Sequence, residues 1–136
     1  MSRENVERAL AAVDAVAHMD EARLLELTHP DVEWHSFLAQ LGEGGVYRGH
    51  DGIREYAGDL REAWEVFSEE VRDTLAVGET VLLIGDLRYR GQGSGIDTES
   101  TVGQLIKFRE GRIVYMRAVR DPEDALDAVG KTTGSP

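Results

Sequence analysis

Two nearby stretches decide the fold: Val32-Glu33-Trp34-His35-Ser36-Phe37 and Tyr47-Arg48-Gly49-His50-Asp51-Gly52-Ile53. The first is rich in β-branched and aromatic residues, which favours a short strand. The second contains glycines and leads into an apolar pattern of helical period, which predicts a loop followed by an amphipathic helix from about Asp51. We expect that helix to present one broad apolar face, made of Ile53, Tyr56, Ala57, Leu60, Ala63, Trp64 and Phe67.

Two helices are predicted before the strand. Asp20 is a good N-cap for the short second helix, which we expect to end at Pro30 before a strand over 31–37. The first helix is expected over residues 2–17, because apolar residues repeat there at three- and four-residue spacing: Val6, Ala9, Leu10, Val13 and Ala17.

The second half of the chain changes to strand patterns. Tight turns predict that successive strands are antiparallel neighbours, and a last helix is expected over 121–130. The fold class is therefore α+β, in the order α-α-β-α-β-β-β-β-α, with a cone-shaped curved antiparallel sheet and helices packed on its concave face. The expected strands are 71–77, 80–90, 96–109 and 112–119, with turns at Gly78-Glu79 and Glu110-Gly111.

Composition limits the classes of protein. The 136 residues fit a single domain over 1–130, followed by a polar tail over 131–136 that we expect to be disordered. A formal net charge of −11 argues against nucleic acid and against an anionic membrane surface as partners. The chain contains no cysteine, no run of about 20 apolar residues and no signal-peptide pattern, so a cytoplasmic location is expected. The four histidines lack metal-ligand spacing, and no metal or cofactor is expected.

Several short motifs occur in a fixed order along the chain. They are Asp31-Val32-Glu33-Trp34-His35, Tyr47-Arg48-Gly49 before Ile53-Arg54-Glu55-Tyr56, Phe108-Arg109-Glu110-Gly111-Arg112-Ile113-Val114, Met116-Arg117-Ala118-Val119, and a closing segment from Asp121 to Gly130. Together they resemble the SnoaL-like or ketosteroid-isomerase-like superfamily, also called nuclear-transport-factor-2-like, with its cystatin-like fold. The resemblance covers nearly the whole chain and implies a pocket inside the cone. Since this fold hosts many activities, it does not by itself name one.

The resemblance carries two catalytic positions onto this sequence. The general-base aspartate of the ketosteroid isomerases falls on His35, and the aspartate that donates to the oxyanion falls on Gln104. The donating tyrosine falls near Ala12, where the chain has no tyrosine. His35 would point into the cone and move a proton, since imidazole titrates near neutral pH. Gln104 could donate to a ligand carbonyl, or it could pair with another side chain.

The remaining candidates are apolar or aromatic residues of the pocket. Strict alternation places Trp34 opposite His35, although a bulge could bring it inward. The outer sheet face carries both apolar and charged residues, and the resemblance implies a homodimer through that face. The expected lining is Trp34, Tyr56, Trp64, Val102, Met116 and Ala118.

Two functions remain open at this point. One is a cofactor-independent isomerase, cyclase or dehydratase that acts on an apolar, carbonyl-bearing small molecule, with His35 as the proton-transfer group. The other is a non-catalytic domain of the same fold that binds a hydrophobic small molecule or mediates a dimeric interaction. The two differ in whether His35 and Gln104 face the same void.

Overall fold

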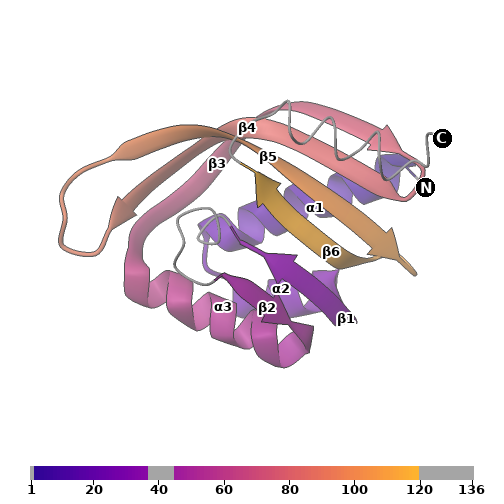
Figure 1. Cartoon of the computed structure of the whole chain (residues 1–136), viewed down its shortest axis with the longest axis horizontal. Helices are drawn as coiled ribbons and strands as arrows, with labels where there is room; N and C mark the ends of the chain where they lie inside the picture. Colours follow the sequence, from indigo (N-terminus) through magenta and orange to yellow (C-terminus); the bar gives the residue numbers. More distant parts are fainter. Residues whose placement is uncertain (1, 37–44, 120–136) are drawn as a thin grey trace.

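The structure is a computed structural model that describes residues 2–36 and 45–119 (Figure 1). The predicted last helix, the tail and Phe37 lie outside these ranges. The elements in order are α1 (Ser2–Ala17), α2 (Glu21–Leu27), β1 (Thr28–His35), β2 (Val46–Arg48), α3 (Gly49–Ala63), β3 (Trp64–Val77), β4 (Thr80–Gly91), β5 (Thr98–Arg109) and β6 (Arg112–Val119).

The strands form one curved, open sheet in the order β2-β1-β6-β5-β4-β3. The predicted hairpins β3–β4, β4–β5 and β5–β6 are antiparallel, as is β1–β2. The pair β1–β6 is parallel, so the expected all-antiparallel sheet is wrong at this one pair. A tight turn forces an antiparallel pairing, and no such turn joins β1 to β6. The α+β class and the curved sheet are confirmed.

The first two helices follow the sequence closely. The bounds predicted for α1 are confirmed, and Asp20 accepts a hydrogen bond from the backbone N–H of Arg23 as the N-cap of α2. Leu10 is wrong as a core residue, because 38% of it is exposed. Pro30 does not end α2, since β1 already begins at Thr28 and the Thr28 hydroxyl donates to the carbonyl of Leu24.

The boundary between α3 and β3 differs most from the prediction. Helix α3 ends at Ala63, and Trp64 is already extended, with φ −124° and ψ 134°. Trp64 and Phe67 therefore belong to β3, which begins seven positions before the expected Val71. An aromatic residue at every third position fits a helix, but the same segment also alternates between the two faces of a strand. The predicted helical period is therefore wrong from Trp64 onward, where the chain follows the period of a strand.

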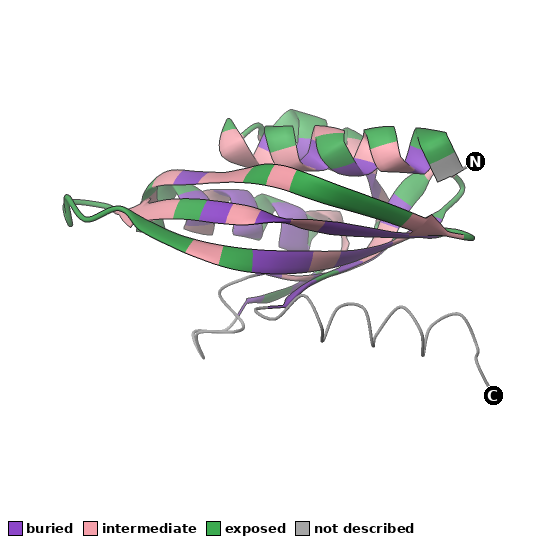
Figure 2. Cartoon of the chain, turned by 90° about the horizontal axis from the view of Figure 1, so that it is seen from above, coloured by how far each residue is buried: buried purple, intermediate pink, exposed green. Residues whose placement is uncertain are grey.

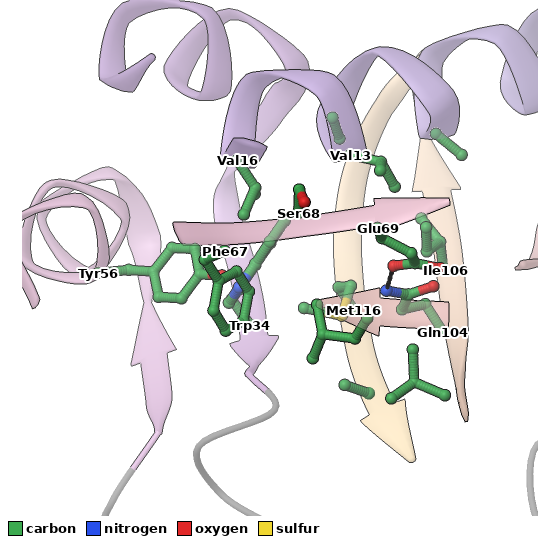
Figure 3. A pocket seen from close by; sticks show the side chains of 15 residues that line it. Val13, Val16, Trp34, Tyr56, Phe67, Ser68, Glu69, Gln104, Ile106 and Met116 are labelled. Atoms are coloured by element: carbon green, nitrogen blue, oxygen red, sulfur yellow. Dashed lines mark hydrogen bonds between the residues drawn. The ribbon is translucent and has the colours of Figure 1, made fainter. Parts of the chain in front are cut away.

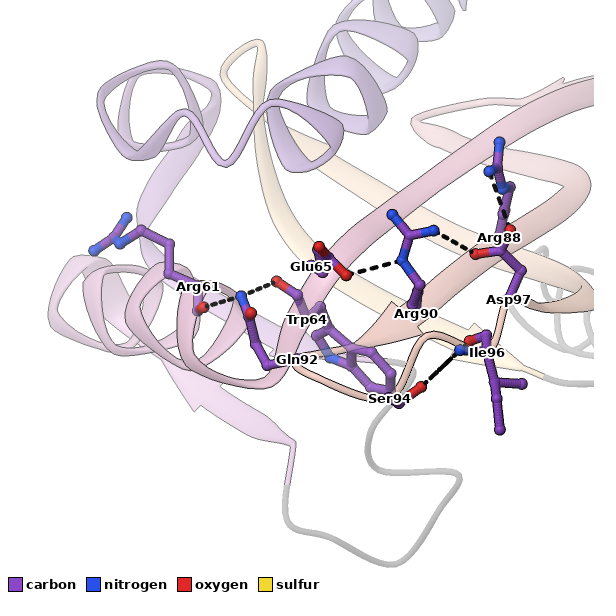
Figure 4. A network of polar contacts seen from close by, with 9 residues as sticks. All are labelled: Arg61, Trp64, Glu65, Arg88, Arg90, Gln92, Ser94, Ile96 and Asp97. Atoms are coloured by element: carbon purple, nitrogen blue, oxygen red, sulfur yellow. Dashed lines mark hydrogen bonds and ion pairs between the residues drawn. The ribbon is translucent and has the colours of Figure 1, made fainter.

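Polar contacts hold this junction in place (Figure 4). The side-chain amide of Gln92 donates to the carbonyls of Arg61 and Trp64, which lie at the end of α3. Arg90 donates to Glu65 across the β3–β4 pair and also to Asp97. These bonds tie the last turn of α3 to the distal end of the β4–β5 hairpin, so the chain leaves the helix directly as a strand.

The main hydrophobic core lies between the helices and one face of the sheet. Helix α1 runs along this face and packs on β3 and β4, while α3 packs on β1 (Figure 2). Inward-pointing residues alternate along each strand, as with Val81, Leu83 and Leu87 on β4. A smaller cluster of Leu82, Leu105 and Val119 lies on the opposite face. In the described ranges, no helix is both long enough and apolar enough to cross a membrane.

Strand β3 crosses β4 unusually closely at Gly85. The pairing register shifts between Val71 and Asp73, which marks a bulge beside the Val71–Gly85 pair. A Cβ atom added at Gly85 would lie 2.4 Å from the carbonyl oxygen of Glu70 and 2.7 Å from Glu69 Oε2. Only glycine fits under the bulged strand.

This close approach predicts the effect of a single methyl group. We expect Gly85→Ala to lower the free energy of unfolding by about 3 kcal/mol, since the new atom overlaps backbone that cannot move alone. Gly58→Ala is the matched control, because nothing lies within 4 Å of its Cβ position and it lies inside α3. That change should stabilise the helix by about 0.5–1 kcal/mol. Urea unfolding measures both; equal stability of Gly85→Ala and the parent would contradict the account.

Candidate functional site

A cavity lies between α1, α3 and the inner face of the sheet (Figure 3). Its volume is about 50 Å³. Since one water needs roughly 10–15 Å³, the cavity can hold more than a single water. The lining is Ala9, Ala12, Val13, Val16, Trp34, Tyr56, Phe67, Ser68, Glu69, Leu87, Val102, Gln104, Ile106, Met116 and Ala118.

The space exists because α1 faces the sheet with small side chains. Ala9 and Ala12 are buried against it and leave room that larger residues would fill. Across the cavity, Trp34 and Tyr56 form an aromatic wall with ring centroids 5.4 Å apart. The ring of Tyr47 continues this row 5.2 Å beyond Tyr56, and its hydroxyl donates to Asp59 at 2.6 Å. Tyr47 therefore supports the aromatic wall on the side away from the cavity.

Glu69 brings a carboxyl group into this largely apolar lining. Among the described lining residues, it is the one with an acidic or basic side chain apart from the weakly acidic phenol of Tyr56. Burial raises the pKa of Glu69 to about 7; the nearby charge of Asp86 adds to this, and a hydrogen bond from Gln104 opposes it. A carboxyl group with such a pKa can both give and take a proton near neutral pH.

Gln104 lies on β5, which is separated from the strand of Glu69, β3, by β4. Its Nε2 donates a hydrogen bond to Glu69 Oε1, and Figure 3 shows the amide and carboxyl groups facing one another. The remaining oxygens, Glu69 Oε2 and Gln104 Oε1, are buried and have no hydrogen-bond partner among the described residues. Of the two alternatives left open for Gln104, the structure therefore shows the pairing with another side chain.

His35 lies outside the cavity. Val32 and Trp34 of β1 and the following Ser36 are buried, while Glu33 and His35 are partly exposed on the other face. His35 Nε2 lies 2.6 Å from Glu33 Oε2, and the His35 ring lies 5.4 Å from that of Tyr115. The bond to His35 lowers the pKa of Glu33. The expectation that His35 points into the cone is wrong, because the core takes the apolar face of β1.

Most of the other predicted lining residues are brought together by the fold. Trp34, Tyr56, Val102, Met116 and Ala118 line the cavity. Trp64 does not, and instead packs behind the wall, with its ring 5.7 Å from Phe67 and 5.3 Å from Tyr89. His35 and Gln104 therefore do not face a common void. Within the two described ranges, no three His, Asp or Glu side chains converge as metal ligands do.

Sequence reasoning missed Glu69, although the sequence contains a signal for it. In an extended segment, Phe67, Glu69 and Val71 share one face, and Phe67 is buried. The sequence pattern instead predicts a helix through Phe67, and a helix does not place Phe67, Glu69 and Val71 on one face. A charged residue between two apolar ones on an inward face is the pattern that would have revealed it.

Comparison with known proteins agrees with this architecture. A family model described as a SnoaL-like domain matches residues 7–116. No curated protein matches the sequence. The solved structures described next are each less than 25% identical to this chain and so support the fold alone.

Three solved structures with different descriptions share this fold. A protein of unknown function described as NTF2-like, from Burkholderia pseudomallei, is 20% identical, with 91% of this chain and 95% of that chain covered and a TM-score of 0.75. An LEH-like epoxide hydrolase from M. tuberculosis is 15% identical, with 93% and 84% covered and a TM-score of 0.73. A protein with a ketosteroid isomerase-like fold from Catenulispora acidiphila is 14% identical, with 91% and 92% covered and a TM-score of 0.75.

The raised pKa of Glu69 predicts a pH-dependent stability. The pKa is 4.5 in the unfolded chain and about 7 in the folded protein, so the folded state holds this proton more tightly. The free energy of unfolding should therefore fall as pH rises from 4.5 to 7, by roughly 3 kcal/mol, and level off above 7.

Glu69→Gln isolates this contribution. Glutamine resembles the protonated carboxyl group in shape, so the variant should match the parent at pH 4.5 and exceed it in stability above pH 7. Urea unfolding across this range measures the difference. The exposed neighbour Glu70 provides the control, and Glu70→Gln should leave the pH dependence unchanged. A constant difference between Glu69→Gln and the parent at all pH values would contradict the assignment.

Proposed function

This chain belongs to the family of SnoaL-like domains, and we propose that it transfers a proton to or from a small, apolar, oxygen-bearing molecule bound beside Glu69. One observation carries the proposal: a single carboxyl group lies in a largely apolar cavity and titrates near pH 7. A general acid or base works best when its pKa lies near the working pH. The reaction class is an isomerisation, cyclisation or dehydration, and Glu69 takes the role first expected of His35.

The lining also limits the charge of the substrate. Within the described residues, no Lys, Arg or His belongs to it, so an anion would leave water without gaining a cationic partner. Apolar residues and the aromatic wall favour a compact ring or short chain. The proposed substrate is therefore an uncharged compound with a carbonyl, hydroxyl or similar oxygen, and carboxylates and phosphates are excluded.

A non-catalytic binding protein is the competing function. One observation favours it: Gln104 already occupies one oxygen of Glu69, so the carboxyl group is partly committed inside the protein. A binder would need only the shape and polarity of the cavity. The two functions therefore differ in whether a bound compound exchanges protons with Glu69.

Deuterium exchange tests proton transfer directly. Cyclohexanone is a suitable probe because it is uncharged, compact and carries exchangeable hydrogens next to its carbonyl. We expect the protein to accelerate exchange of these hydrogens in D₂O, followed by proton NMR, and Glu69→Gln to lose about 100-fold or more of the acceleration. Glu70→Gln should keep it. Binding of cyclohexanone without any acceleration would support the non-catalytic function instead.

Filling the cavity tests whether it is the binding site. Ala12→Leu adds bulk where α1 lines the void, so we expect binding of cyclohexanone to weaken at least about tenfold. Stability should stay level or rise, by about 0.5–2 kcal/mol, as in other cavity-filling changes. Ala11→Leu is the matched control, since Ala11 does not line this cavity. Chemical-shift titration measures the affinity, and unchanged binding by Ala12→Leu would place the ligand elsewhere.

A further inference from the structure

Two buried oxygens beside the cavity lack a partner. Glu69 Oε2 and Gln104 Oε1 belong to side chains that are already joined through Gln104 Nε2 and Glu69 Oε1. Both oxygens are acceptors when Glu69 is ionised. Leaving such a group buried and unpaired destabilises the folded protein. When Glu69 is ionised, both Glu69 Oε2 and Gln104 Oε1 are therefore buried acceptors without a donor among the described residues.

We propose that Glu69 carries a proton on Oε2 in the resting protein and donates it to Gln104 Oε1, which closes a two-bond acid–amide pair. One proton then provides a partner for both oxygens. A primary amide suits this role because it has a donor and an acceptor side by side, as the protonated carboxyl group does. This inference rests on the proposed function and makes Gln104 the positioning residue of the proton-transfer group.

The surroundings of Glu69 Oε2 agree with a neutral carboxyl group. The atom lies over the sheet at Gly85, where an added Cβ would be only 2.7 Å away, so a water has little room on that side. Among the described residues, Asp86 of β4 is the charged group that disfavours ionisation of Glu69. The phenol of Tyr56 on α3 has its pKa raised by burial and by the charge of Glu69. Arg72 is engaged with Asp86 at 3.1 Å. The described lining residues from α1, β5 and β6 carry no charge.

A closed pair fixes the order of the chemistry. The resting site is an acid, so the first step gives a proton to an oxygen of the substrate: the O–H bond of Glu69 breaks, and a new O–H bond forms on the substrate. The carboxylate left behind keeps its bond from Gln104 Nε2, which stabilises the anion. Gln104 therefore supports both states of Glu69. Substrates of this site carry a carbonyl to be activated or a hydroxyl to be eliminated as water.

Infrared spectroscopy tests where the proton lies. Below pH 7 the parent should show the carbonyl stretch of a protonated carboxyl group that disappears with an apparent pKa of about 7 and is absent in Glu69→Gln. Gln104→Leu removes the acceptor, so the band should move to higher wavenumber. Glu70→Gln should alter neither quantity.

Two results would overturn the closed pair. One is the lack of any protonated carboxyl band that depends on Glu69; the other is an unchanged band position in Gln104→Leu. If that variant does not fold, Gln104→Asn serves instead, because it keeps the amide but withdraws it from reach. Circular dichroism confirms folding of either variant.

Exchange kinetics separate this inference from the proposed function. An acid-first site should lose Glu69-dependent exchange of cyclohexanone as pH rises above 7, whereas a base-first site should gain it. A gain would overturn the closed pair and leave the proposed function standing. A titrating carboxyl band without any exchange would support the closed pair and contradict proton transfer to a substrate.

Discussion

The close approach of β3 to Gly85 is the constraint on which the site depends. Since glycine has no side chain, the backbone of β3 can lie directly over β4 and bulge at Arg72. Residues before the bulge then point toward the core, including Phe67 and Glu69. A larger residue at position 85 would push the edge strand outward, along with the carboxyl group it carries. Backbone geometry, rather than any direct contact with a ligand, therefore sets the position of the reactive group.

The other wall of the cavity depends on the small residues of α1. Helix α1 contributes the stretch Ala9 to Val16 to the core, and its alanines stand where a well-packed core would place larger side chains. Burying alanine instead of leucine forgoes hydrophobic stabilisation and leaves a void. A void bounded by an aromatic wall and a carboxyl–amide pair is a site for a compact molecule that is largely apolar and has one polar end.

Much of the fold could be predicted because local signals were strong. The bounds of α1, the Asp20 cap and the hairpins each rest on spacing or turn residues that act over a few positions. The start of β3 could not be predicted in this way. Its aromatic residues fit both periods, and the decision is made by distant contacts such as the bonds from Gln92 to the end of α3. Tertiary contacts therefore determine that the segment from Trp64 is a strand and not a continuation of α3.

The same limit explains the candidate site. Trp34 and His35 are neighbours on one strand, so one of them must face out, and the sequence alone offers a reason for either. The resemblance favoured His35, whereas burial of Val32 and Trp34 favoured the opposite face, and the larger apolar area decided the outcome. With β1 in this orientation, the proposed proton-transfer group is Glu69 of β3 instead of His35. This assignment depends on which residues of β1 and β3 face the core, and local sequence does not fix that.

The carboxyl–amide pair is difficult to explain as a support for the fold. Holding Glu69 with a pKa of about 7 costs roughly 3 kcal/mol of stability above that pH. Apolar residues of similar size usually fill such a position at no loss or with a gain. The neighbouring positions show that the fold accepts them, since Val102 and Ile106 occupy the same face of β5 on either side of Gln104. A carboxyl group that weakens the protein above pH 7 and lines the cavity supports the proposed proton transfer better than it supports a role in packing.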